Sequence, residues 1–300
     1  MLKFEREQRV CRVGDVEIGG QPGERPTVLI GSIFFAGHQI VRDAQRGIFD
    51  EGKAEALLSA EAEASAFSGN PRFIDPVGDT GVALIRYIEF LARRTTAPIL
   101  VDSPLPKVRI EALRHFAGTA VMPRLVYNSI AEDRTDEELS AIRESGIQTA
   151  IVLAFSLKAM KPAQRIKLLE DELIPAAHSA GIENILIDTG VLDIASASWS
   201  AVAIREVKAA LGYPTGCAPA NAICTWEKMK VRGSGAYTAA MATALAMMAF
   251  QGADFLLYGP MRFAPWVYAT IGAANALLAY GGRLSGVRPA NNQHPLYRVL

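Results

Sequence analysis

The chain has 300 residues, 50% of them hydrophobic and 21% charged, a composition that is typical of a globular protein and excludes a disordered or fibrous one. Lysine plus arginine equals aspartate plus glutamate at 31 each, which removes any general electrostatic reason for binding nucleic acid or an anionic membrane. The length suits a single α/β barrel of roughly 250 residues as well as two smaller domains.

The first predicted element is a β-hairpin at residues 9–20, where two stretches of alternating polarity flank Gly14 and Asp15. We expect this hairpin to close the bottom of the fold that follows. A long insertion, residues 34–51, separates the first strand of that fold from its helix, and it is either a lid over the active face or a plain surface excursion.

After the hairpin, strands alternate with helices to the end of the chain. Strands are predicted at 27–32, 72–77, 98–103, 124–129, 149–155, 184–189, 214–219 and 253–259. Helices are predicted at 54–67, 82–94, 106–116, 135–146, 162–181, 199–212, 237–252 and 263–281. Strict alternation implies a parallel sheet, and eight units of roughly 30 residues fit a closed (β/α)8 TIM barrel better than an open sheet.

No linker or low-complexity segment interrupts the series, so we predict one domain spanning residues 1–300. Within it, residues 1–25 carry the hairpin, 26–282 the barrel and 283–300 a polar tail.

Cysteine usage and the termini predict a cytoplasmic protein. Cys11, Cys217 and Cys224 are odd in number and widely spaced, which is unlike a disulfide framework or a zinc site. The charged N-terminus lacks the apolar core of a secretory signal, and the apolar stretch 236–250 is too short to span a bilayer.

Four of the predicted strands end in a lone carboxylate or amide, at Asp75, Asp102, Asn128 and Asp188. Closing the barrel brings these tips around one mouth, and Asn221, just after the seventh strand, joins them. Each residue taken singly could instead cap the next helix or turn.

The five side chains offer many hydrogen-bond acceptors and some donors, with no cation obviously paired to them. Such a rim suits a neutral heterocycle with several N–H groups, and a divalent cation such as magnesium is the competing ligand. The sequence has no GxSxG elbow, phosphate-binding P-loop or HExxH motif, and its four histidines are scattered.

Several longer blocks resemble a known family. FEREQRV (4–10), VEIGGQPGERPTVLIGSIFF (16–35), GNPRFIDPVGDT (69–80), VRIEAL (108–113), YNSI (127–130), LIDTG (186–190) and GCAPANAI (216–223) are similar to the H subunit of tetrahydromethanopterin S-methyltransferase. They resemble most of all its bacterial relatives, which move methyl groups between corrinoid proteins and tetrahydrofolate. The resemblance covers nearly the whole chain and implies a TIM barrel of the pterin-binding type.

The resemblance also implies roles for the tip residues. In related pterin-binding barrels an Asp at the third strand, an Asn at the fourth and an Asp at the sixth grip the pterin, which corresponds here to Asp102, Asn128 and Asp188. An Asn after the seventh strand approaches N5, which makes Asn221 the implied catalytic residue, and Asp75 is expected in the same cup.

On this basis the expected reaction is methyl transfer between a methylated corrinoid protein and N5 of tetrahydrofolate. The cobalamin is expected on a separate, transient partner, because the chain lacks the DxHxxG-type motif of a cobalamin carrier, and no bound metal is expected. The alternatives are a tetrahydromethanopterin-dependent methyltransferase of the same family, a magnesium-dependent TIM-barrel lyase and a noncatalytic scaffold. The apolar character of the last two helices further predicts a homodimer.

Overall fold

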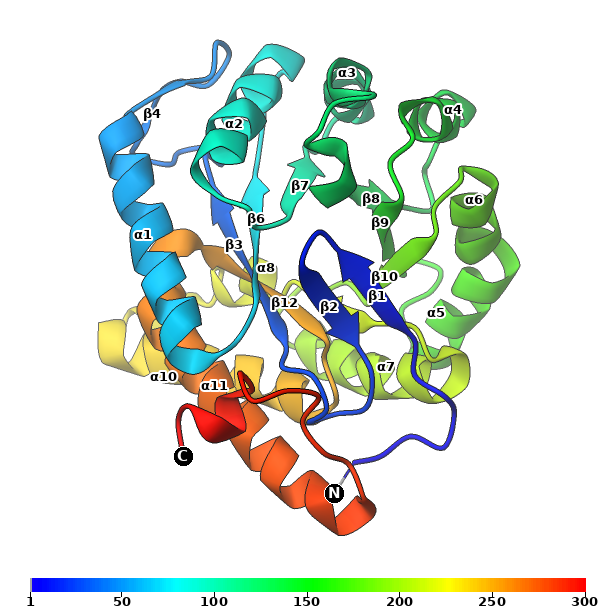
Figure 1. Ribbon diagram of the computed structural model, residues 1–300, viewed down its shortest axis with the longest axis vertical. Helices are drawn as coiled ribbons and strands as arrows, with labels where there is room; N and C mark the ends of the chain where they lie inside the picture. The colour runs from blue at the N-terminus through cyan, green and yellow to red at the C-terminus, as the bar shows by residue number, and fades with distance from the viewer. Residues whose placement is uncertain (1) are drawn as a thin grey trace.

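Eight parallel strands form a closed barrel in the computed structural model, which describes residues 2–300 (Figure 1). The strand order around the barrel is the order in the chain, with bounds Val28–Ile33 (β3), Arg72–Pro76 (β6), Ile99–Asp102 (β7), Leu125–Ile130 (β8), Thr149–Leu153 (β9), Asn184–Asp188 (β10), Thr215–Cys217 (β11) and Phe255–Pro260 (β12). The predicted (β/α)8 TIM barrel is therefore confirmed.

Helices surround the barrel and connect its strands (Figure 1). Their bounds are Glu51–Ser68 (α1), Gly81–Arg94 (α2), Pro106–Phe116 (α3), Asp136–Ser145 (α4), Pro162–Leu168 (α5), Ile174–Ser179 (α6), Ser196–Leu211 (α7), Ala220–Ile223 (α8), Glu227–Lys230 (α9), Ser234–Phe250 (α10) and Ala264–Gly282 (α11). Short 3₁₀ turns lie at Met122–Arg124, Met261–Phe263, Arg283–Ser285 and Pro295–Tyr297. The short helices α8 and α9, between β11 and α10, were not predicted.

The predicted helix at 162–181 is divided into α5, a π turn at Leu169–Leu173 and α6. Pro175 lies in the first turn of α6 and has no backbone N–H to donate to the preceding turn. A wider turn just before the proline accommodates its ring, so the helical axis continues without a break in the chain's path.

The N-terminal hairpin closes one end of the barrel. Its strands are β1 (Val10–Val13) and β2 (Val16–Gly19), joined at Gly14 and Asp15. Cys11, Val13 and Ile18 of the hairpin form one buried cluster with the inward-facing residues of the barrel strands. The hairpin lies across the amino-terminal ends of these strands, so the predicted closure of the bottom is confirmed.

The insertion between β3 and α1 is present and carries a small two-stranded sheet, β4 (Val41–Asp43) and β5 (Ile48–Phe49). Phe34 opens it with a φ of 65°, a conformation that is costly for a bulky residue. Its ring stacks on Tyr87 of α2 at 4.3 Å and lies 4.4 Å from the ring of Phe49. These contacts fix the start of the insertion against the barrel's outer layer.

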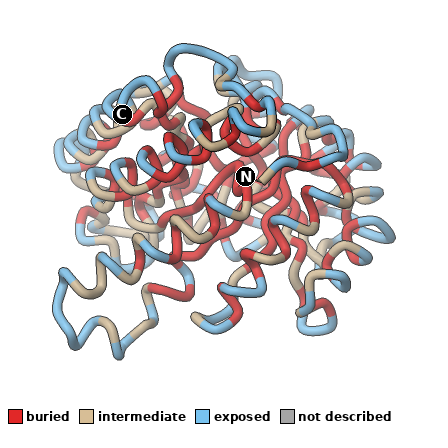
Figure 2. Tube along the Cα trace, turned by 90° about the horizontal axis from the view of Figure 1, so that it is seen from below, coloured by how far each residue is buried: buried red, intermediate tan, exposed pale blue. Residues whose placement is uncertain are grey.

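Burial follows the layered plan: the strands and the inward faces of the helices are buried, and the outer faces of the helices are exposed (Figure 2). α11 packs against α1 and α10, yet leaves Leu277 and Tyr280 exposed, and Leu284 in the 3₁₀ turn that follows α11 is exposed as well. Within residues 2–300, none of the helices combines the length and the apolar character that a membrane span requires.

Candidate active site at the barrel mouth

The predicted tip residues form one layer at the carboxyl ends of the strands. Side chains alternate along a strand, so every second residue points into the barrel. A layer of apolar side chains fills the barrel interior. Two residues further along each strand, the next inward-pointing positions are Ser32, Asp75, Asp102, Asn128, Leu153 and Asp188. The strand register pairs Ser32 with Asp75, Asp102 with Asn128, and Leu153 with Asp188. The change from apolar to polar therefore occurs at the same height around most of the barrel.

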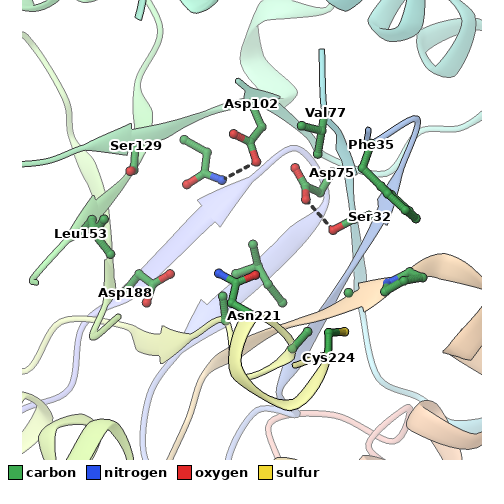
Figure 3. Close-up of a pocket in the computed structure, with 16 residues that line it drawn as sticks. Ser32, Phe35, Asp75, Val77, Asp102, Ser129, Leu153, Asp188, Asn221 and Cys224 are labelled. Carbon is green, nitrogen blue, oxygen red and sulfur yellow. Dashed lines mark hydrogen bonds between the residues drawn. The ribbon is translucent and has the colours of Figure 1, made fainter. Parts of the chain in front are cut away.

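A cavity of about 550 Å³ opens above this layer. All five residues that the sequence singles out line it, namely Asp75, Asp102, Asn128, Asp188 and Asn221 (Figure 3). The remaining lining is largely apolar, with Phe35, Val77 and Leu257 among its members. The barrel thus brings together residues that lie up to about half the chain apart, in the arrangement that the strand pattern predicts.

Asp75 is the most deeply buried of the three acids at the mouth. Its Oδ2 accepts a hydrogen bond from the Ser32 hydroxyl at 2.6 Å. Its Oδ1 is buried and has no hydrogen-bond partner among the described residues. Burial raises the pKa of Asp75, while the Ser32 hydroxyl and the neighbouring Asp102 oppose this rise. An unpartnered buried oxygen at the wall of a cavity is placed to accept from a ligand.

Asp102 and Asn128 form a hydrogen-bonded pair on adjacent strands, with Asn128 Nδ2 donating to Asp102 Oδ2 at 3.0 Å. Burial raises the pKa of Asp102 well above its ordinary value, and the nearby Asp75 raises it further. Arg109 and the Asn128 amide oppose the rise. Asp75 and Asp102 are neighbouring carboxyls in a buried site, and they therefore hold a proton more readily than isolated carboxyls do. Together they offer a ligand a hydrogen-bond donor as well as acceptors.

Asp188 lies apart from this pair, at the tip of β10. Its Oδ1 accepts from the backbone N–H of Gly190 at 2.6 Å. Burial raises its pKa to about 6, although the Gly190 hydrogen bond and the positive charge of Arg165 both favour the ionised form. Asp188 is therefore mostly ionised at neutral pH and can accept hydrogen bonds from a ligand.

A buried network behind β7 and β8 holds two of the tips in place. Arg109 donates to the carbonyl of Ser103 at 2.5 Å, to the Tyr127 hydroxyl at 2.9 Å and to Glu138 at 2.6 Å. The Tyr127 hydroxyl also donates to Glu138. Since Ser103 follows Asp102 and Tyr127 precedes Asn128, the network fixes the backbone on which both side chains stand.

A second buried cation, Arg165, stands behind Asp188. It donates to the carbonyl of Thr189 at 2.6 Å and to Ser200 Oγ at 3.2 Å. Sequence reasoning missed both arginines. One signal was available: Arg109 and Arg165 occupy helix positions three and four residues before buried apolar ones, and a cation at such a core position indicates a buried network.

Asn221 is the most accessible of the five predicted residues. It lies in α8, directly after β11, and its side chain is exposed at the rim of the cavity. Its amide has no hydrogen-bond partner in the part of the chain that the structure describes, so both its donor and its acceptor face the open mouth. Cys224 also lines the cavity and accepts a hydrogen bond from the Tyr237 hydroxyl at 3.7 Å.

The charged side chains that line the mouth are all acidic. Three carboxyls line the cavity, and its lining as described contains no lysine, arginine or histidine. Across residues 2–300, no three side chains of His, Cys, Asp or Glu are grouped so that they could hold a metal ion. The arrangement suits an uncharged or cationic heterocycle that presents several N–H donors along its edge.

Comparison with known proteins gives consistent findings. Residues 6–290 match the family model described as the tetrahydromethanopterin S-methyltransferase MtrH subunit. The H subunit of tetrahydromethanopterin S-methyltransferase from Methanopyrus kandleri is 37% identical over 311 residues, which cover 97% of each chain. The H subunit of the putative methyltransferase mtx from Methanosarcina acetivorans is 33% identical over 307 residues, which cover 99% of each.

Solved structures show the same fold at lower identity. Dihydropteroate synthase from Xanthomonas albilineans matches 92% of this chain and 99% of its own, with a TM-score of 0.64 and 19% identity. The enzyme from Coxiella burnetii, in complex with pteroic acid, matches 90% of this chain and 99% of its own, with a TM-score of 0.63 and 17% identity.

Proposed function

This chain belongs to the family of the MtrH subunit of tetrahydromethanopterin S-methyltransferase, and from that premise we propose that it transfers a methyl group between a methylated corrinoid protein and N5 of tetrahydrofolate. The family is one of methyltransferase subunits, and the fold is the pterin-binding type of barrel. Membership of this family gives no support to the magnesium-dependent lyase or to the noncatalytic scaffold.

The observation that carries the proposal is the set of unpaired acceptors at the mouth. A reduced pterin presents N–H groups at its exocyclic amine, at N3 and at N8. Asp188 is ionised near neutral pH, and the buried Oδ1 of Asp75 has no partner among residues 2–300. Asp102 and Asn128 add one carboxyl and one amide beside them. We propose that Asp102, Asn128 and Asp188 hold the pyrimidine ring and that Asp75 completes the cup.

Asn221 is proposed to act at N5. In the direction of pterin methylation the N5 lone pair attacks the methyl carbon, the carbon–cobalt bond breaks with its electrons remaining on cobalt as Co(I), and N5 then loses its proton to solvent. N5 carries positive charge as the new bond forms, and the free Asn221 carbonyl can stabilise that charge. The rest of the benefit comes from positioning, which can contribute several kcal/mol.

A corrinoid partner must approach the mouth from solvent. The cobalamin is proposed to be carried by a separate protein, whose cofactor face would meet the rim formed by Asn221 and the insertion at 34–51. We also propose a homodimer through α11 and the turn that follows it, where Leu277, Tyr280 and Leu284 are exposed.

Tetrahydromethanopterin is the second candidate acceptor, and the names of several relatives favour it. Tetrahydrofolate is the acceptor implied by the resemblance of the chain to the bacterial relatives of the family. The two cofactors share the reactive part of the heterocycle, so the mouth alone does not separate them.

An anaerobic single-turnover assay tests the proposal. A methylated corrinoid protein is mixed with the chain and either pterin, and the N5-methylated product is measured. Methyl transfer to tetrahydrofolate is expected, and it should be lost in Asp188→Ala but kept in Asp193→Asn, whose Oδ1 also accepts a backbone N–H, at 2.7 Å, but which lies outside the cavity. Transfer to tetrahydromethanopterin alone would favour the second candidate, and transfer to neither pterin would contradict the proposal.

A further inference from the structure

A second cavity, of about 720 Å³, adjoins the mouth. It lies between the insertion after β3, the first turns of α1 and the turn after β12. Phe35 lines both cavities, so the two are neighbours on the same face of the barrel. Nothing in the proposed methyl transfer at N5 requires this second space.

The two cavities differ in charge. The mouth is lined by three carboxyls, whereas the second cavity is lined by Lys53 and Arg262 and by no acid among the described residues. The Arg262 guanidinium lies over the Phe263 ring at 4.7 Å and has no ion-pair partner within residues 2–300. An anionic group would therefore be attracted to the second cavity and repelled from the first.

The ammonium group of Lys53 has no hydrogen bond to Asp50, the nearest acid, and it can therefore bind a ligand. Asp50 accepts from Arg42 at 3.2 Å and from the backbone N–H of Lys53 at 3.1 Å. The Lys53 ammonium lies 4.0 Å from Asp50 Oδ2, beyond hydrogen-bond distance. The side chain of Lys53 is 69% exposed, so it can turn toward a ligand at little cost.

His38 contributes a neutral donor to the same wall. Its Nδ1 accepts from the backbone N–H of Phe34 at 3.1 Å, which leaves Nε2 to carry the ring proton. Burial and the charge of Arg262 lower the pKa of His38, in agreement with a neutral ring. The His38 ring also stacks on Phe35 at 4.5 Å, so a pair of flat rings stands where the two cavities meet.

We propose that the second cavity binds the anionic tail of the pterin substrate while the heterocycle occupies the mouth. This inference rests on the proposed function. A reduced folate carries an aryl ring on the C6 side of the heterocycle and ends in carboxylates, and tetrahydromethanopterin carries an aryl ring and ends in a phosphate-bearing chain. In either case the aryl ring would pass Phe35 and His38, and the anionic end would meet Lys53 and Arg262.

The test compares ligands with and without the tail. Binding of 6-methyltetrahydropterin, tetrahydrofolate, tetrahydrofolate triglutamate and tetrahydromethanopterin is measured anaerobically by calorimetry on the full chain. The double variant Lys53→Gln/Arg262→Gln should weaken the tailed ligands by about fivefold to tenfold and leave 6-methyltetrahydropterin unchanged. Raising the salt concentration should weaken only the tailed ligands. A larger loss for the triglutamate or for tetrahydromethanopterin would identify carboxylates or phosphate as the preferred tail.

Matched controls come from a lysine and an arginine that do not line the second cavity. Arg283 lies over the Tyr280 ring at 5.1 Å, and Lys167 lies 3.8 Å from Asp171, so both resemble the tested residues but lie outside the cavity. The variant Lys167→Gln/Arg283→Gln should bind every ligand as the wild type does. Equal losses for tailed and tailless ligands in the Lys53/Arg262 variant, or no loss for either, would overturn the tail site while leaving the proposed function standing. Failure of every pterin to bind the wild type would instead overturn the proposed function.

Discussion

Buried carboxylates at the two ends of the barrel differ in whether they have an ion-pair partner. At the bottom, Asp254 accepts from the Lys208 ammonium at 2.5 and 2.6 Å and from the backbone N–H of Thr215 at 2.8 Å. Lys208 also donates to the carbonyl of Gly20 in the hairpin. At the mouth, Asp75, Asp102 and Asp188 have no ion-pair partner among residues 2–300. We infer that the bottom pairs its charges for stability and that the mouth leaves its acceptors open for a ligand.

The largest effect is expected at the bottom. Lys208→Met leaves Asp254 buried without its cation and should lower the free energy of unfolding by about 3–5 kcal/mol. The second change Asp254→Asn removes the stranded charge and should recover part of that loss. Urea unfolding of the single and double variants measures both. If the double variant is no more stable than Lys208→Met, the ion pair is not what stabilises this end.

Replacements at the mouth should weaken ligand binding without lowering the stability of the fold. Asp102→Ala, Asn128→Ala and Asp188→Ala should each weaken pterin affinity by about 1–3 kcal/mol, because each leaves a ligand polar group unpaired. The free energy of unfolding should change little in Asn128→Ala and should not fall in the two aspartate variants, because burial raises the pKa of both carboxyls. Calorimetric titration beside urea unfolding checks this, with Asp193→Ala as the control that should keep full affinity. Unchanged binding in Asp102→Ala and Asp188→Ala would refute the assignment of the site.

Asn221 sharpens the comparison within the mouth. If its amide acts at N5, its benefit appears mainly in the charged transition state. Asn221→Ala should lower the single-turnover rate more than tenfold, equivalent to more than about 1.4 kcal/mol, and weaken pterin binding less. Asn221→Asp should keep part of the activity by stabilising positive N5. Equal losses in rate and affinity would make Asn221 a binding residue only.

The pH dependence of binding should depend on Asp188. Its pKa of about 6 means that roughly a tenth of this group is ionised at pH 5, so pterin affinity should fall about tenfold between pH 7 and pH 5. The contribution of Asp188 to the free energy of unfolding changes with pH in the opposite direction to the affinity. The native state holds the proton between pH 3.8 and about 6, so this group's contribution to the free energy of unfolding falls as the pH rises through that window.

Asp188→Asn isolates that contribution. Titrations and unfolding curves recorded from pH 5 to pH 7 should show a smaller pH dependence in the variant than in the wild type. Identical pH profiles in the two proteins would show that another group sets the dependence.

The smallest effect on the site is expected from changes at the proposed dimer interface. Leu277 and Tyr280 are 54% and 61% exposed on α11, far from the mouth. Light scattering at micromolar concentration should give twice the single-chain mass of 32.3 kDa for the wild type and the single-chain mass for Leu277→Glu. Pterin affinity should be the same in both. A wild-type mass near 32.3 kDa would rule out the predicted dimer.

The sequence predicted the barrel well because strand tips carry a periodic signal. Alternation places Asp75, Asp102, Asn128 and Asp188 on the inward face, and parallel strands bring their carboxyl ends to one rim. The signal for the hairpin turn at Gly14 also comes from neighbouring residues in the chain. These features depend on residues close together in the chain.

What the sequence did not reveal depends on contacts between distant residues. The second cavity needs Lys53 and Arg262, more than two hundred residues apart, to lie beside the same insertion. The proton-sharing relation of Asp75 and Asp102 depends on their spacing and burial, and the Arg109 network depends on the packing of α3 against α4. No local pattern specifies distances of this kind.

Unfolding measured with and without tetrahydrofolate tests the contrast between the two ends most directly. A ligand at a hundred times its dissociation constant should stabilise the wild type by about 2.7 kcal/mol. Lys208→Met should start from a lower stability and keep this full increment, whereas Asp188→Ala should start at or above the wild-type stability and lose about 1–2.5 kcal/mol of the increment. An Asp188→Ala variant that keeps the whole increment, or a wild type that tetrahydrofolate does not stabilise, would contradict the account.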